Sequence, residues 1–99
     1  MSGLHAKLVF VPTEHGGRRT PITSGYRPQF YFGGQDFECR SIEVIPERWV
    51  YPSEATDAIL TLSEYATSAL AGKLPEGTKF QLREGARVVA EGVVTAEQK

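Results

Sequence analysis

The stretch GGRRTPITSGYRPQFYF (residues 16–32) joins glycines, arginines and hydroxyl side chains directly to a run of aromatic residues. Such residues are typical of phosphate-binding loops, but a P-loop needs two glycines five residues apart followed by Lys and Ser/Thr. Residues 16–20 lack that spacing and the lysine, and Pro21 and Gly25 disfavour a following helix. The stretch is therefore predicted to be a long turn that leads into a strand, and not a nucleotide site.

Outward from this stretch, short β-branched and aromatic segments alternate with Gly- and Pro-rich turns. This pattern is typical of an antiparallel barrel or sandwich. Alternation places Tyr26, Phe30 and Phe32 in the core, and Pro28 should lie at an edge or bulge because it cannot donate to a ladder. The expected strands cover residues 7–11, 26–32, 37–45, 58–62, 78–83 and 87–95, the last two joined by a glycine turn.

Two segments leave alternatives open. Residues 63–73 can form a short helix with Tyr65, Ala69 and Leu70 on one face and Gly72 as its cap. The apolar segment 49–51 is predicted to be buried, and its alternative is an exposed aromatic anchor for a protein partner.

Composition describes an ordinary soluble, cytoplasmic domain. The 99 residues suffice for one domain, 1–99, with 40% hydrophobic residues and a net charge of -1. A single cysteine, Cys39, excludes an internal disulfide framework and fits a reducing compartment. No signal peptide or membrane-spanning apolar run is expected.

The charges are distributed unevenly. Residues 1–30 have a balance of +3, residues 31–64 a balance of -5, and the remainder +1. Nucleic-acid binders usually have an overall basic excess, because phosphate neutralisation dominates their affinity. Any RNA contact must therefore come from a local patch.

No catalytic or metal-binding constellation is recognisable. His5, His15 and Cys39 are the only soft ligands and lack paired zinc-ligand spacing. A Cys39–His15 nucleophile pair would require the fold to bring the two together. We therefore predict no enzyme activity, no metal and no cofactor.

Two motifs resemble the C-terminal β-barrel domain (domain 3) of bacterial elongation factor Tu. That family has a Gly-Gly-Arg-His-Thr-Pro loop followed by Gly-Tyr-Arg-Pro-Gln-Phe-Tyr-Phe, which matches residues 16–32. Its closing hairpin, Phe-Ala-Ile-Arg-Glu-Gly-Gly-Arg-Thr-Val-Gly-Ala-Gly-Val-Val, is similar to residues 80–94. The resemblance implies a six-stranded antiparallel closed barrel without the factor's GTPase domain and second barrel. In the full factor this barrel packs on the GTPase domain and helps hold the T-stem of aminoacyl-tRNA.

The resemblance also implies candidate contact residues. Arg18 matches the arginine of the glycine loop, near the interface with the GTPase domain and tRNA, and Arg19 replaces a histidine. Gln29 and Glu84 match positions close to the T-stem. The full candidate set, which adds framework arginines and the hairpin glycine, is Arg18, Arg19, Arg27, Gln29, Arg83, Glu84, Gly85 and Arg87.

Departures from the family pattern affect the expected function. A threonine that would contact the T-stem backbone is Glu38 here, and a carboxylate repels phosphate. Arg18 and Arg19 can lie in a turn where they are solvated or locally paired. Alternatively, they can contact a phosphate or a protein. We expect Arg27 to pair with a carboxylate. The sequence thus predicts a non-catalytic, translation-related module for a protein partner, such as a translation GTPase, with weak tRNA binding as the alternative.

Overall fold

Strict alternation of buried and exposed residues in β1 (Leu4–Phe10) shows how this chain builds its core. Leu4, Ala6, Leu8 and Phe10 are buried, and the residues between them face solvent. This is the period of a strand with one face on a packed interior. The computed structural model describes residues 3–96.

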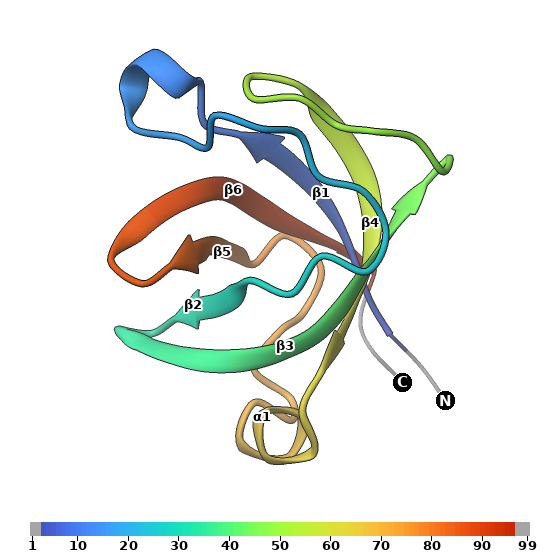
Figure 1. Cartoon of the computed structure of the whole chain (residues 1–99). Helices are drawn as coiled ribbons and strands as arrows, with labels where there is room; N and C mark the ends of the chain where they lie inside the picture. The colour runs from blue at the N-terminus through green and yellow to red at the C-terminus, as the bar shows by residue number, and fades with distance from the viewer. Residues whose placement is uncertain (1–2, 97–99) are drawn as a thin grey trace.

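Six antiparallel strands close into a barrel in the order β1-β4-β3-β2-β5-β6 (Figure 1). The predicted closed six-stranded barrel is confirmed, and the sandwich alternative is not. One 3₁₀ turn, η1, and one short helix, α1, lie on opposite sides of the barrel in this view. The remaining elements are η1 Thr13–His15, β2 Gln29–Phe32, β3 Gln35–Ile45, β4 Ala55–Leu62, α1 Glu64–Ala69, β5 Lys79–Glu84 and β6 Arg87–Ala96.

The interior is packed around two stacked phenylalanines. The ring centroids of Phe30 and Phe80 are 4.5 Å apart, and Phe80 lies opposite Gly92 in the pairing of β5 with β6. A Cβ on Gly92 would come within 2.3 Å of the Phe80 ring. The glycine therefore provides the room that the aromatic ring fills.

The aromatic strand is shorter than predicted. It begins at Gln29 and not at residue 26, because Pro28 has no N–H to donate to a ladder. Phe30 is fully buried as predicted, whereas Tyr26 and Phe32 are partly buried and pack against the core. Tyr26 lies outside β2, and its backbone contacts β3 instead. Ile42 N donates a hydrogen bond to Tyr26 O.

The helix that the sequence allows in residues 63–73 forms as α1, and its predicted inner face is confirmed at Ala69 and Leu70 but wrong at Tyr65. Ala69 packs against the core and Leu70 is buried, whereas Tyr65 is 69% exposed and Ala66 is buried in its place. The C-cap is Leu70 and not the predicted Gly72. Ser63 caps the helix by accepting a hydrogen bond from Ala66 N.

The predicted burial of segment 49–51 is wrong for both aromatic residues. Trp49 and Tyr51 are 59% and 53% exposed, and Val50 between them is buried. Val50 takes the inward position because it forms a β-bridge with Ile22. Alternation then turns its two neighbours outward.

Among residues 3–96, we find no helix with the length and hydropathy that a membrane span requires.

The fit of Phe80 against Gly92 predicts a specific rescue. Gly92→Ala should destabilise the barrel by about 1–3 kcal/mol, because overpacking forces the buried ring to move. In a Phe80→Leu background the same substitution should cost at least about 1 kcal/mol less, since the clashing ring atoms are gone. Urea unfolding followed by the fluorescence of Trp49 measures both free energies.

Gly25→Ala is the matched control for this cycle. Gly25 has a φ of +97°, and a Cβ added there would meet no atom within 4 Å. The cost of this substitution is therefore conformational, and Phe80→Leu should not relieve it. Equal costs of Gly92→Ala in both backgrounds would contradict the proposed packing.

Candidate functional site

Glu84, the last residue of β5, joins the glycine loop to the barrel. Its carboxylate pairs with Arg18 Nη1 and accepts a 2.5 Å hydrogen bond from the Tyr26 hydroxyl. The Arg18 guanidinium also lies 5.1 Å from the centre of the Tyr26 ring. Two residues of the stretch 16–32 therefore meet the closing hairpin at one carboxylate.

The loop holds Arg18 by its backbone and by the two guanidinium nitrogens that do not pair with Glu84. Gly17 lies so close to Val11 that a Cβ would be 2.0 Å from the Val11 carbonyl oxygen, which only glycine allows. Thr13 Oγ1 donates to Arg18 O at 2.5 Å. Arg18 donates from Nε to Thr20 O at 3.2 Å and from Nη2 to Thr20 Oγ1 at 2.8 Å. Arg18 is thus anchored in the loop and is not a free side chain.

The environment of Tyr26 in this site raises its pKa. Burial, followed by the hydrogen bond to Glu84, raises the pKa of Tyr26, and the nearby Arg18 only partly opposes this. A buried phenol resists ionisation because its charged form loses hydration. Tyr26 therefore remains a hydrogen-bond donor to Glu84 throughout the physiological pH range.

The hairpin turn is fixed by a second set of contacts. Gly85 N donates to Gln29 Oε1 at 2.8 Å, and Gly85 O accepts from Arg83 Nε at 3.3 Å. The Arg83 guanidinium lies 4.2 Å from the centre of the Tyr31 ring, and its Nε is 4.0 Å from Asp36 Oδ1. Gln29 and Arg83 therefore stabilise the turn that follows Glu84.

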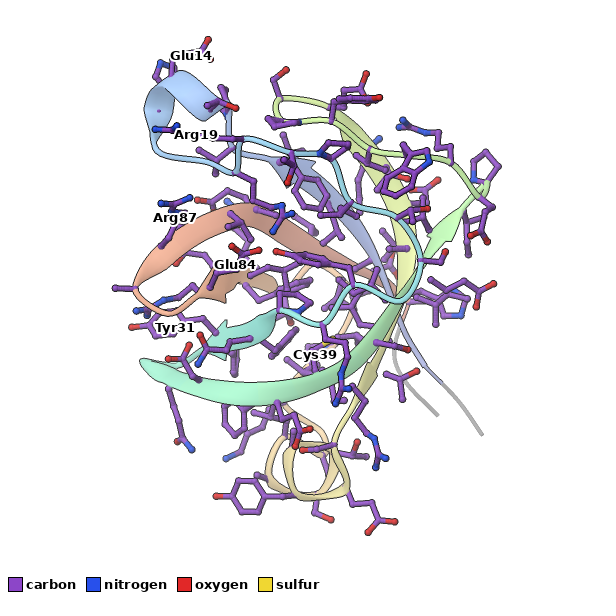
Figure 2. All side chains as sticks on the ribbon, viewed as in Figure 1. Glu14, Arg19, Tyr31, Cys39, Glu84 and Arg87 are labelled. Carbon is purple, nitrogen blue, oxygen red and sulfur yellow. The ribbon has the colours of Figure 1, made fainter. Side chains whose placement is uncertain are left out.

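The other predicted residues lie at or beyond the border of this site. Arg87 is the strand partner of Glu84, and both Arg19 and Arg87 are exposed on the side of the molecule that Figure 2 shows at the left. Neither has an ion pair within residues 3–96. Arg27, two residues before Gln29, pairs with Glu38 at 3.7 Å, in line with the carboxylate partner expected for it.

Sequence reasoning misses the roles of two tyrosines in this site. The sequence predicts Tyr26 in the core, yet its hydroxyl reaches Glu84, 58 residues away. Tyr31 lies outside the predicted core set, and its ring supports Arg83. No local pattern signals either pairing, because both depend on which strands become neighbours in the barrel.

The remaining nucleophile and ligand candidates lie apart from the site. Cys39 is buried, which raises the pKa of its thiol to about 12, whereas His15 is exposed at the end of η1. The thiol is therefore protonated at neutral pH and is a poor nucleophile. Within residues 3–96, His, Cys, Asp and Glu form no group of three that could hold a metal ion.

The family comparison agrees with this architecture. The family model of the elongation factor Tu C-terminal domain matches residues 1–97. The chain belongs to this family, which is a translation-related family of non-catalytic β-barrel domains. Membership implies interaction with components of the translation machinery in general.

The shared carboxylate predicts energetic coupling between loop and hairpin. In a double-mutant cycle of Arg18→Met and Glu84→Gln, we expect a coupling of about 1 kcal/mol in the free energy of unfolding, because both side chains are only partly exposed. The control cycle pairs Arg19→Met with Glu84→Gln and should show no coupling. Equal coupling in both cycles would show that the effect is long-range charge and not the contact.

The raised pKa of Tyr26 predicts how stability depends on alkaline pH. An unfolded tyrosine loses its proton near pH ~10, whereas folded Tyr26 keeps it, so the free energy of unfolding should fall as the pH rises above about 10. Tyr26→Phe should make this fall shallower in urea titrations between pH ~10 and ~12.

Cys39→Ala is the comparison for the Tyr26 titration. The pKa of the Cys39 thiol is also raised, so Cys39 should also lower the free energy of unfolding as the pH rises. This loss should begin near pH ~8.5, the pKa of an unfolded thiol, which is below the range in which Tyr26 acts. If Tyr26→Phe leaves the slope above pH ~10 unchanged, the phenol is not protected in the folded protein.

Proposed function

We propose that this barrel is a non-catalytic binding module of the bacterial translation machinery, acts in the cytoplasm, and recognises a protein partner. The observation that favours a protein over RNA is charge compensation at the candidate arginines. Arg18, Arg27 and Arg83 each have a carboxylate within 4.0 Å. A phosphate would have to compete with these carboxylates.

The compensating carboxylates also repel a nucleic-acid backbone. Glu38 and Asp36 lie on the outer face of β3 next to β2. By the family resemblance, Glu38 replaces a threonine that would contact the T-stem. Glu84 is partly exposed beside Arg18. Protein interfaces tolerate such paired charges at their rims, where they set specificity and orientation.

We further propose that the partner is a translation GTPase. In full-length factors that this chain resembles, the barrel packs on a GTPase domain. The Arg18–Glu84–Tyr26 contacts hold the glycine loop and the closing hairpin as one surface. A surface that is fixed before binding loses little conformational entropy when a partner docks.

Weak tRNA binding is the second candidate, and a separate observation supports it. Arg19 and Arg87 are exposed and form no ion pair with residues 3–96. Arg19 follows Arg18 in the sequence, and Arg87 is the strand partner of Glu84. Both arginines could therefore reach phosphates beside the Arg18–Glu84 pair.

One titration distinguishes the two candidates. The chain is titrated at about 50 and about 200 mM salt with tRNA and with a translation GTPase truncated before its own C-terminal barrel. We expect GTPase binding whose affinity changes little with salt. RNA binding through two phosphate contacts would instead weaken about tenfold over this range.

Charge variants supply the controls. Arg19→Ala/Arg87→Ala should leave GTPase binding largely intact but abolish any tRNA binding, whereas Lys73→Ala/Lys79→Ala removes the same charge from other exposed positions and should change neither. Salt-sensitive tRNA binding that only the arginine pair abolishes, with no GTPase binding, would reject the protein-partner proposal.

A further inference from the structure

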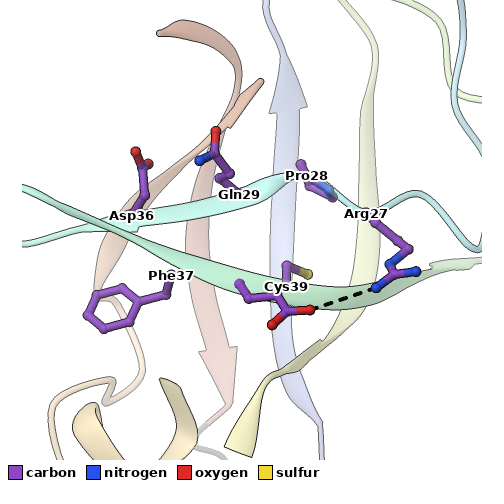
Figure 3. Close-up of a pocket in the computed structure, with 7 residues that line it drawn as sticks. Arg27, Pro28, Gln29, Asp36, Phe37 and Cys39 are labelled. Carbon is purple, nitrogen blue, oxygen red and sulfur yellow. Dashed lines mark ion pairs between the residues drawn. The ribbon is translucent and has the colours of Figure 1, made fainter. Parts of the chain in front are cut away.

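A pocket of about 480 Å³ opens on the outer face of the barrel between β2 and β3 (Figure 3). In the close-up, Gln29 and Asp36 point to one side of the two strands and Phe37 points to the other. The complete lining is Arg27, Pro28, Gln29, Asp36, Phe37, Glu38 and Cys39. The lining thus includes two carboxylates, an amide and the apolar ring of Pro28.

The two carboxylates have unused capacity to accept hydrogen bonds. Within residues 3–96, neither Asp36 nor Glu38 accepts a side-chain hydrogen bond, and their only ion pairs are long, at 4.0 Å to Arg83 and 3.7 Å to Arg27. A carboxylate can accept two parallel N–H bonds from one guanidinium at a much shorter distance. Both groups are therefore available to an incoming cation.

Arg27 shows which chemical group this pocket accommodates. Its guanidinium lies at Glu38, marked by the dashed line in Figure 3, and both side chains are about two-thirds exposed. Exposed ion pairs of this kind contribute little to stability. The chain therefore places a guanidinium at the pocket with a weak contact that an external group can replace.

An exposed aromatic ring on α1 lies beside this part of β3. Tyr65 is 69% exposed and stacks on Phe37, which is itself buried, with ring centroids 6.3 Å apart. Ser63 N donates to Glu38 O at 3.0 Å, which fixes the start of α1 beside this part of β3. Aromatic faces next to carboxylates favour cations, and arginine in particular.

We infer that this pocket receives an arginine side chain of the protein partner, and that Arg27 occupies Glu38 in the free barrel until that side chain displaces it. The inference rests on the proposed function, because it specifies the chemistry of a protein partner. The incoming guanidinium would bind Glu38 in place of Arg27, and its aliphatic stem would lie on Pro28.

The test uses N-acetyl-arginine amide as the probe and the full chain as the receptor. Amide chemical shifts of Gln29, Phe37 and Cys39 are followed by NMR during a titration to millimolar probe at low salt. We expect saturable shifts at these residues. The neutral isostere N-acetyl-citrulline amide should bind at least about fivefold more weakly, because it cannot form the charged contacts.

Three variants assign the binding to the pocket. Glu38→Gln should abolish the shifts, whereas Arg27→Ala should tighten binding severalfold by removing the competing guanidinium. Glu43→Gln, an exposed acid on the same strand outside the pocket lining, should bind as the original chain does. Equal binding of arginine and citrulline amides, or no gain in Arg27→Ala, would overturn the inference.

The outcome separates from that of the proposed function. If the arginine probe fails to bind while the truncated GTPase binds, the partner uses another surface and only this inference is wrong. If the probe binds with the expected variant pattern and the GTPase does not, the pocket stands and the choice of partner fails.

Discussion

Closure of the barrel through β1 is the constraint on which the rest of the structure depends. β1 pairs with β4 on one side and with β6 on the other, so the first strand of the sheet is also the neighbour of the last. Closure removes the exposed strand edges that an open sheet would present. It also fixes which outward-facing residues become neighbours, and the candidate site consists of such neighbours.

Closure has a volume requirement that Gly92 and Phe80 meet together. Six strands enclose a narrow interior, and stacked Phe30 and Phe80 fill it only because Gly92 leaves the space opposite. With the interior filled, β2 and β5 pair directly and bring Gln29 opposite Arg83. Gln29 can then accept the bond from Gly85 N that holds the turn after Glu84. Core packing and site geometry are thus consequences of the same strand pairing.

Much of the fold is predictable from the sequence, because alternation and turn residues are local signals. The closing hairpin and the break at residues 33–34 follow from such signals, and barrel closure follows from the family resemblance. The exposure of Trp49 and Tyr51 is not predictable, since it is decided by the bridge between Val50 and Ile22, which lie far apart in the sequence. A short apolar segment alone does not show which of its residues faces inward.

The candidate site shows the same division between local and long-range information. Two sequence motifs identify its residues, but they do not show which arginines are paired with carboxylates. Each paired arginine of the site has its carboxylate partner on another strand or loop. Arg18 reaches Glu84 across 66 residues, and Arg83 reaches Asp36 from a different strand. The motifs alone suggest a basic patch, whereas in the folded barrel three of the five candidate arginines lie within 4.0 Å of a carboxylate. This difference favours the proposed protein partner over phosphate, and the Arg27–Glu38 pair is the most exposed of the three.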